Sequence, residues 1–118
     1  MTKHEIDQAI AGHNDRNAEL RITLAKDAID VKEPRQIDFH FWVADQDNAE
    51  LLAAALAKHG LRVAASRRAV IGDSSLPWDL EMIAVQPIEL TLRPEFTEEL
   101  VKVAARFQGR YDGWGTSI

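Results

Sequence analysis

Two hydrophobic periodicities alternate along this chain, and their order constrains the fold more than any other feature of the sequence. In the run from Ile37 to Val43, apolar residues occupy every second position, whereas from Gln46 to His59 they recur every third or fourth position. A period of two predicts a strand, and a period near 3.6 predicts a helix. The elements predicted in this way are strand 37–43, helix 46–59, strand 61–66, strand 78–85, helix 94–108 and strand 110–117.

This order of elements is that of the ferredoxin-like fold, an α+β domain with an antiparallel sheet. Both helices then lie on one face of the sheet. The first and third strands are expected to be central, and the last strand is expected to pair with the first. Another α+β sandwich with a different strand order is the alternative. We assign residues 34–118 to this domain, as a single globular unit.

A further helix is predicted over residues 2–27, so residues 1–33 are assigned to an N-terminal helix and a linker. Thr2 and Glu5 form the T-x-x-E pattern of a capping box, in which the threonine side chain accepts from a free amide of the first turn.

The apolar stripe of this N-terminal helix is interrupted by His13 and Asn17. Residues 12–15 also include a glycine, an asparagine and an aspartate, which lower helix propensity. We therefore expect a break near these residues or a loosely packed helix. His13 and Asn17 are expected to be solvated, and a seam between two copies of the helix is the alternative.

The composition excludes several classes of function. The chain has no cysteine, which removes disulfides, thiolate catalysis and cysteine-ligated zinc. It has no apolar run of about 18 residues that predicts a membrane span. Residues 1–5 lack the basic and then apolar order of a secretory signal, so a cytoplasmic location is expected. The formal net charge of −5 disfavours direct binding of nucleic acid and suits a basic protein partner.

Polar residues alternate with the core residues of the first strand. Asp38, His40 and Trp42 share one side of that strand, and Asp79 and Glu81 share one side of the third. In a ferredoxin-like sheet these two strands are neighbours, so the five side chains should meet on the helix-free face. The last strand should lie beside them.

This face suggests one enzymatic or metal-binding hypothesis, in which His40 acts with Asp38 and Glu81 as an acid–base group or as ligands of a divalent ion. The competing interpretation is a solvated sheet face. The sequence contains neither a P-loop nor a dinucleotide fingerprint, and we expect no catalytic activity, cofactor or bound metal. Arg67 and Arg68 are interpreted as a solvated surface pair, with contact to a phosphate as the alternative.

The last stretch, Arg110 to Thr116, places two large aromatic residues beside two glycines. Chain ends fray unless they are tied down, and aromatic side chains bury large apolar areas. We therefore expect Tyr111 and Trp114 to dock a final strand or turn. An additional interpretation places Tyr111, Asp112 and Trp114 at the edge of a recognition surface.

The hexapeptide from Tyr111 to Thr116 also resembles the terminal signature of the RraB family, protein regulators of ribonuclease E activity. The run from Glu33 to Trp42 is similar to the first-strand region of that family, and the similarity covers roughly residues 20–117. The resemblance implies a cytosolic, non-enzymatic, ferredoxin-like protein that acts by binding another protein. The expected partner is a ribonuclease E-like endoribonuclease or a related RNA-decay assembly, and the expected effect is inhibition.

Interface anchors are often aromatic or charged residues surrounded by a polar rim. The residues predicted to bind the partner are Asp38, His40, Trp42, Glu81, Tyr111, Asp112 and Trp114. Two alternatives use the same face: the N-terminal helix lies across it and buries Trp42, or two copies of the chain pair through it as a homodimer.

Overall fold

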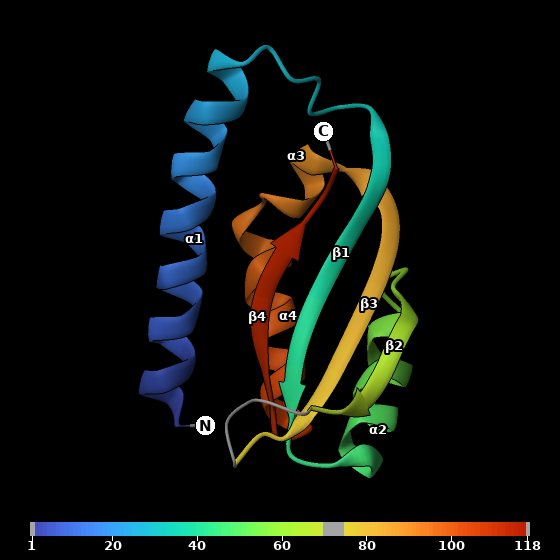
Figure 1. Cartoon of the computed structure of the whole chain (residues 1–118). Coiled ribbons are helices and arrows are strands. Elements are labelled where there is room, and N and C mark those ends of the chain that lie inside the picture. Colours follow the sequence, from blue (N-terminus) through green and yellow to red (C-terminus); the bar gives the residue numbers. More distant parts are fainter. Residues whose placement is uncertain (1, 70–74, 118) are drawn as a thin grey trace.

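The computed structural model describes residues 2–69 and 75–117, and its elements follow the predicted order closely (Figure 1). The helices and strands are α1 (Lys3–Lys26), β1 (Pro34–Val43), α2 (Gln46–Ala57), β2 (Arg62–Arg68), β3 (Trp78–Pro87), α3 (Ile88–Thr91), α4 (Pro94–Arg106) and β4 (Gly109–Gly115).

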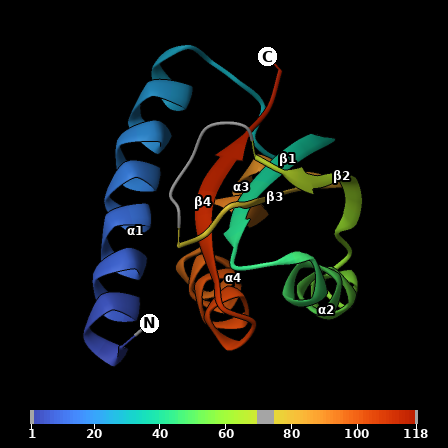
Figure 2. The same ribbon diagram turned by 60° about the horizontal axis from the view of Figure 1, so that its bottom comes forward.

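The four strands form one sheet in the order β2-β3-β1-β4, and each neighbouring pair is antiparallel. β1 and β3 are therefore central, and β4 pairs with β1, as predicted. α2 and α4 cover one face of the sheet (Figure 2). The prediction of an α+β fold is confirmed. The short helix α3, which follows β3 directly, was not predicted.

The core lies between the sheet and α2 and α4. β1 contributes four side chains that are at most 1% exposed: Ile37, Phe39, Phe41 and Val43. They pack against the buried residues Leu52, Leu56, Leu80, Met82, Leu100 and Val103. Burial of each such side chain contributes roughly 1.5–3 kcal/mol relative to exposure. Because a strand alternates its faces, the same burial turns Asp38, His40 and Trp42 to the other side of the sheet.

α1 is one continuous helix of 24 residues, so the predicted break near residues 12–15 is wrong. The helix begins as predicted, because the Thr2 side chain accepts a hydrogen bond from the backbone amide of Glu5 at 3.1 Å. α1 packs on α4 and runs beside β4 at the edge of the sheet (Figures 1 and 2). It does not lie across the helix-free face. Among the described residues, none of the helices combines the length and the hydropathy that a membrane crossing requires.

Candidate functional site

The helix-free face of the sheet is built by three side chains of β1 and their neighbours across the strands. Asp38 lies between Gly115 and Ile83, His40 between Gly113 and Glu81, and Trp42 between Arg110 and Asp79. We define the open face by the side chains of Asp38, His40, Trp42, Arg67, Asp79, Glu81 and Asp112. The predicted meeting of residues from β1 and β3, with the last strand beside them, is confirmed.

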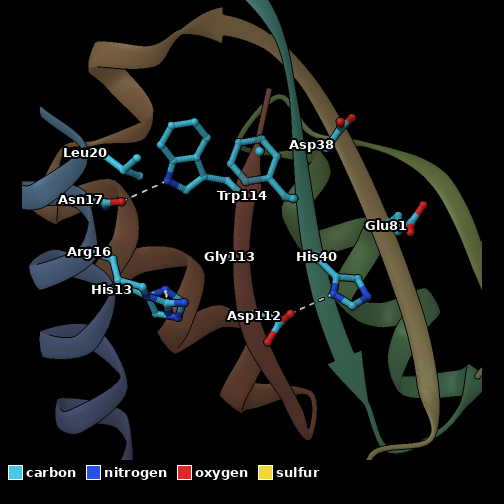
Figure 3. Close-up of a pocket in the computed structure, with 12 residues that line it drawn as sticks. His13, Arg16, Asn17, Leu20, Asp38, His40, Glu81, Asp112, Gly113 and Trp114 are labelled. Atoms are coloured by element: carbon cyan, nitrogen blue, oxygen red, sulfur yellow. Dashed lines mark hydrogen bonds and ion pairs between the residues drawn. The ribbon is translucent and has the colours of Figure 1, made fainter. Parts of the chain in front are cut away.

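His40 is at the centre of a charged network on the open face. Its Nε2 lies 2.6 Å from Oδ1 of Asp79. Its Nδ1 lies 3.2 Å from Oδ2 of Asp112, a contact shown in Figure 3. Both ring nitrogens of an imidazolium donate hydrogen bonds, whereas a neutral ring donates only one. The two carboxylates thus fix the ring orientation from either side.

Arg67 extends this network from β2. Its guanidinium lies 3.4 Å from a carboxylate oxygen of Asp79 and 3.7 Å from one of Glu81. Arg67 and Arg68 are exposed, as expected for a solvated pair. Arg67 was expected to follow the strand, but it lies within β2, opposite Asp79. Because the network depends on a pairing between strands, the local sequence gave no signal for it.

Trp42 completes the open face. Its ring packs edge-on against that of His40, with the ring centroids 4.7 Å apart and an interplanar angle of 72°. Trp42 is half-buried, and α1 stands beside β4 instead of covering it. The alternative in which the N-terminal helix lies across this face and buries Trp42 is therefore wrong.

β4 contains an irregularity that decides which way its aromatic residues point. The register shifts between His40 and Phe41, so that Tyr111 opposes Phe41, Gly113 opposes His40, and Asp112 is the extra residue. Residues directly opposite each other share a face, so Tyr111 and Trp114 turn toward the helix side of the sheet. Asp112 instead reaches the open face and contacts His40.

Tyr111 is a core residue, with only 4% of its surface exposed. Its ring contacts Phe41, at a centroid distance of 5.2 Å, and stacks on His13 at 4.6 Å. Burial raises the pKa of the Tyr111 phenol well above its ordinary value. The prediction that Tyr111 docks the terminal strand is confirmed, but its burial removes it from the predicted set of surface residues. The pairing of Tyr111 with the core residue Phe41 is the physical reason.

Trp114 joins β4 to the N-terminal helix. The side chain is half-buried, and its Nε1 donates a hydrogen bond to Oδ1 of Asn17 at 3.1 Å (Figure 3). Nδ2 of Asn17 donates in turn to Oγ1 of Thr97 in α4 at 3.2 Å. Asn17 is 5% exposed, so the prediction that it is solvated is wrong. It links α1, α4 and β4.

His13 is also buried instead of solvated, with 7% of its surface exposed. Its Nε2 lies 2.9 Å from the carbonyl oxygen of Tyr111, and its Nδ1 lies 2.8 Å from Nη2 of Arg16. A carbonyl only accepts and a guanidinium only donates, so these contacts select the neutral tautomer with hydrogen on Nε2. Burial lowers the pKa of His13; the bond to Tyr111 raises it, and Arg16 lowers it further.

A pocket of about 310 Å³ opens between α1 and the open face (Figure 3). Gly113 and Gly115 lie beneath it, opposite His40 and Asp38. A Cβ atom built on either glycine would meet no atom within 4 Å. The two glycines therefore leave this part of the open face hollow, where larger side chains would fill it.

The donor atoms of His40, Asp79 and Glu81 lie within 4.8 Å of one another, an arrangement that could hold a metal ion. The metal-binding hypothesis from the sequence combined His40 and Glu81 with Asp38. In the structure the third residue of the group is Asp79. The guanidinium of Arg67 already lies beside both carboxylates, so the cluster is paired internally. This arrangement favours an ion-pair network over a metal centre.

The chain is similar to known proteins over nearly its whole length. A family model described as "Regulator of ribonuclease activity B", RraB, matches residues 14–116. The Regulator of ribonuclease activity B of Shewanella amazonensis is 25% identical over 111 residues, which cover 94% of this chain and 79% of that protein. The protein of the same name from Pseudoalteromonas atlantica is 26% identical over 100 residues, covering 85% of this chain and 86% of its own.

A third relative, from Shewanella denitrificans, has the same name and is 29% identical over 100 residues, which cover 85% of this chain and 78% of that protein. The resemblance that the terminal hexapeptide indicated is thus confirmed across the described fold. The chain belongs to the RraB family, the regulators of ribonuclease activity B.

Proposed function

We propose that this protein is a non-catalytic regulator that binds a ribonuclease E-like endoribonuclease through its open face and inhibits it. Membership of the RraB family supports regulation of a ribonuclease. One structural observation supports the open face as the binding surface. This helix-free face presents Trp42 and a charged network, and α1 leaves it uncovered. Aromatic and charged residues grouped in this way are typical anchors of protein interfaces.

The charges of the open face favour a basic protein segment as the partner. Carboxylates occupy the central strands and the irregular position of β4, where Asp38, Asp79, Glu81 and Asp112 lie. The nearby arginines belong to the edge strands, Arg62 and Arg67 to β2 and Arg110 to β4. Carboxylates at the centre repel the phosphates of RNA, whereas they attract lysine and arginine side chains. We therefore assign the inhibition to binding of the enzyme and not to competition for its RNA.

The test is cleavage of a model RNA by the host's own ribonuclease E, with this protein titrated into the reaction. We expect cleavage to slow as the protein concentration rises. The Trp42→Ala variant should bind the enzyme about 2 kcal/mol more weakly, which is roughly a thirtyfold loss of affinity, because it removes an aromatic anchor. Leu51→Ala is the matched control, since Leu51 is 55% exposed on α2, away from the open face.

Circular dichroism of both variants shows whether they keep the fold. Absence of any effect on cleavage, at protein concentrations far above that of the enzyme, would overturn the proposal. Equal inhibition by wild type and a folded Trp42→Ala variant would place the interface elsewhere on the molecule. Unfolding of Trp42→Ala would show that the residue belongs to the core, and the same assay with Asp38→Asn would then test the open face.

A further inference from the structure

We propose that the pocket between α1 and the open face is a receptor for one arginine side chain of a bound protein. The inference rests on the proposed function for the source of that side chain, because it takes the partner to be a protein. Beyond that function, we specify the side chain of the partner that enters the pocket and the residues that hold it. The shape of the pocket, the charges around it and the rigidity of its walls support it in turn.

The pocket is small and is kept open by glycine. Its volume of about 310 Å³ is at the lower end of the range for ligand sites, which suits one long side chain better than a folded segment. Gly115 lies opposite Asp38 with no atom within 4 Å of its potential Cβ, and Gly113 lies in the same way opposite His40. Two residues without side chains, both on the open face of one strand, create the hollow.

The lining of the pocket is acidic. The carboxylates of Asp38, Glu81 and Asp112 border it. The basic groups of the lining are the guanidinium of Arg16 and the imidazoles of His13 and His40. Asp112 and Glu81 are 50% and 44% exposed, so their free oxygens remain accessible. Within the described residues, no lysine, arginine or histidine forms an ion pair with Asp38. A cation that enters the pocket would provide Asp38 with a charged partner.

An aromatic wall distinguishes arginine from other basic groups. Trp114, which is half-buried, borders the same pocket. A planar guanidinium stacks on aromatic rings and donates hydrogen bonds to carboxylates in the same plane, whereas an ammonium group is more strongly hydrated and acts as a point charge. The combination of carboxylates and an indole therefore favours arginine.

The walls are fixed before any partner binds. Asn17 holds the indole nitrogen of Trp114 and is itself held by Thr97. Nδ1 of the buried His13 accepts a hydrogen bond from Arg16, which keeps the competing guanidinium on the α1 side of the pocket. A site whose residues are already ordered loses little conformational entropy on binding. This accounts for two buried polar residues in the middle of α1.

The experiment titrates the protein with N-acetyl-arginine amide and follows the indole N–H resonances of its three tryptophans by NMR. N-acetyl-glutamine amide is the uncharged control ligand. We expect the resonance of Trp114 to move and saturate with the arginine compound, and to move at least tenfold less with the glutamine compound at the same concentration. Equal movement with both compounds, or none with either, would overturn the proposal.

A pair of glycine variants tests the position of the site. Gly115→Leu fills the pocket without backbone strain, because Gly115 does not have a positive φ. The matched control is Gly12→Leu, where the added side chain also meets no atom within 4 Å but lies on α1 outside the pocket. We expect Gly115→Leu to weaken binding of N-acetyl-arginine amide at least tenfold and Gly12→Leu to leave it unchanged. Equal affinity in both variants would contradict the proposal.

The outcomes separate this inference from the proposed function. Binding of ribonuclease E by Gly115→Leu at wild-type affinity, with no binding of the arginine compound, would show that ribonuclease E does not anchor an arginine in this pocket. It would overturn the inference and leave the regulator intact. Saturable binding of the arginine compound by a protein with no effect on ribonuclease E would have the opposite meaning: the receptor would be supported and its partner would be another protein.

Discussion

At the scale of single residues, His13 is a side chain whose protonation state the fold influences. Its burial favours the neutral ring, and both nitrogens are occupied in the tautomer that a carbonyl on one side and a guanidinium on the other select. A protonated ring would have no lone pair for Arg16 and would place two positive charges together. The neutral state of His13 is therefore part of the contact between α1 and β4.

This contact predicts a pH dependence of stability. The pKa of His13 is lowered in the folded state, so on acidification the unfolded chain takes up a proton first. The contribution of neutral His13 to the free energy of unfolding is complete above the ordinary histidine pKa of about 6.5. This contribution is lost as the pH falls through the lowered pKa of the folded state. We expect His13→Gln, which keeps a donor for Tyr111, to lose less stability than wild type between pH 7 and pH 5. Urea unfolding of both proteins at pH 7 and pH 5 measures the loss of stability. Equal losses in wild type and His13→Gln would contradict the role given to His13.

At the scale of elements, α1 is attached to the domain by polar contacts as well as by the apolar packing of Ile6, Ile10 and Leu24. His13 and Asn17 contact β4 and α4, and Arg21 donates to the carbonyl oxygen of Leu92 at 2.8 Å. Leu24 is the buried apolar residue of this helix. α1 also covers the outer side of β4, a strand edge that would otherwise be free to pair with another chain.

The attachment of α1 predicts a large effect of Asn17→Ala. The substitution leaves the Trp114 indole nitrogen and the Thr97 hydroxyl without this partner, and each unsatisfied buried group costs about 1–3 kcal/mol. We expect the free energy of unfolding to fall by an amount in that range, measured by urea titration followed through tryptophan fluorescence.

Asn14→Ala is the matched control in the same helix. Among the residues that the structure describes, the buried Oδ1 of Asn14 has no hydrogen-bond partner, so its removal should be neutral or stabilising. Equal destabilisation by the two alanine variants would show that the bridge from Asn17 to Trp114 and Thr97 does not fasten α1.

At the scale of the whole molecule, a net charge of −5 and a carboxylate-rich open face create a field that attracts a basic partner. Such attraction acts mainly on the rate of association, and salt screens it over about 10 Å at 0.1 M. We expect the same charge to disfavour binding of RNA to the face that we assign to the protein partner.

The charge arrangement predicts that association with ribonuclease E slows steeply as salt is raised. Asp38→Asn should lower the association rate several-fold at low salt and flatten the salt dependence, because it removes a charge at the centre of the open face. Glu50→Gln is the control, since it removes an exposed charge of the same sign on α2. Stopped-flow binding at several salt concentrations measures the association rates of both variants. An identical dependence of the rate on salt for the two variants would place the interface away from the open face.

The sequence by itself determined the elements and the two faces of the central strands. Strict alternation from Ile37 to Val43 divides that strand into a core side and a polar side, because successive side chains of a strand point in opposite directions. The order of the elements then places Glu81 and Asp79 beside His40 and Trp42. The terminal hexapeptide indicated the family, since six consecutive positions agreed with its signature.

Only the tertiary structure decided what depends on distant partners. His13 and Asn17 resemble solvated residues of a weak helix, but their partners in β4 and α4 lie 98 and 80 positions away in the chain. One extra residue in β4, Asp112, puts Tyr111 and Trp114 on the same face of the sheet although they are three positions apart. Local periodicity carries no information on either point, because burial and register are set by the elements that pack against a segment and not by the segment itself.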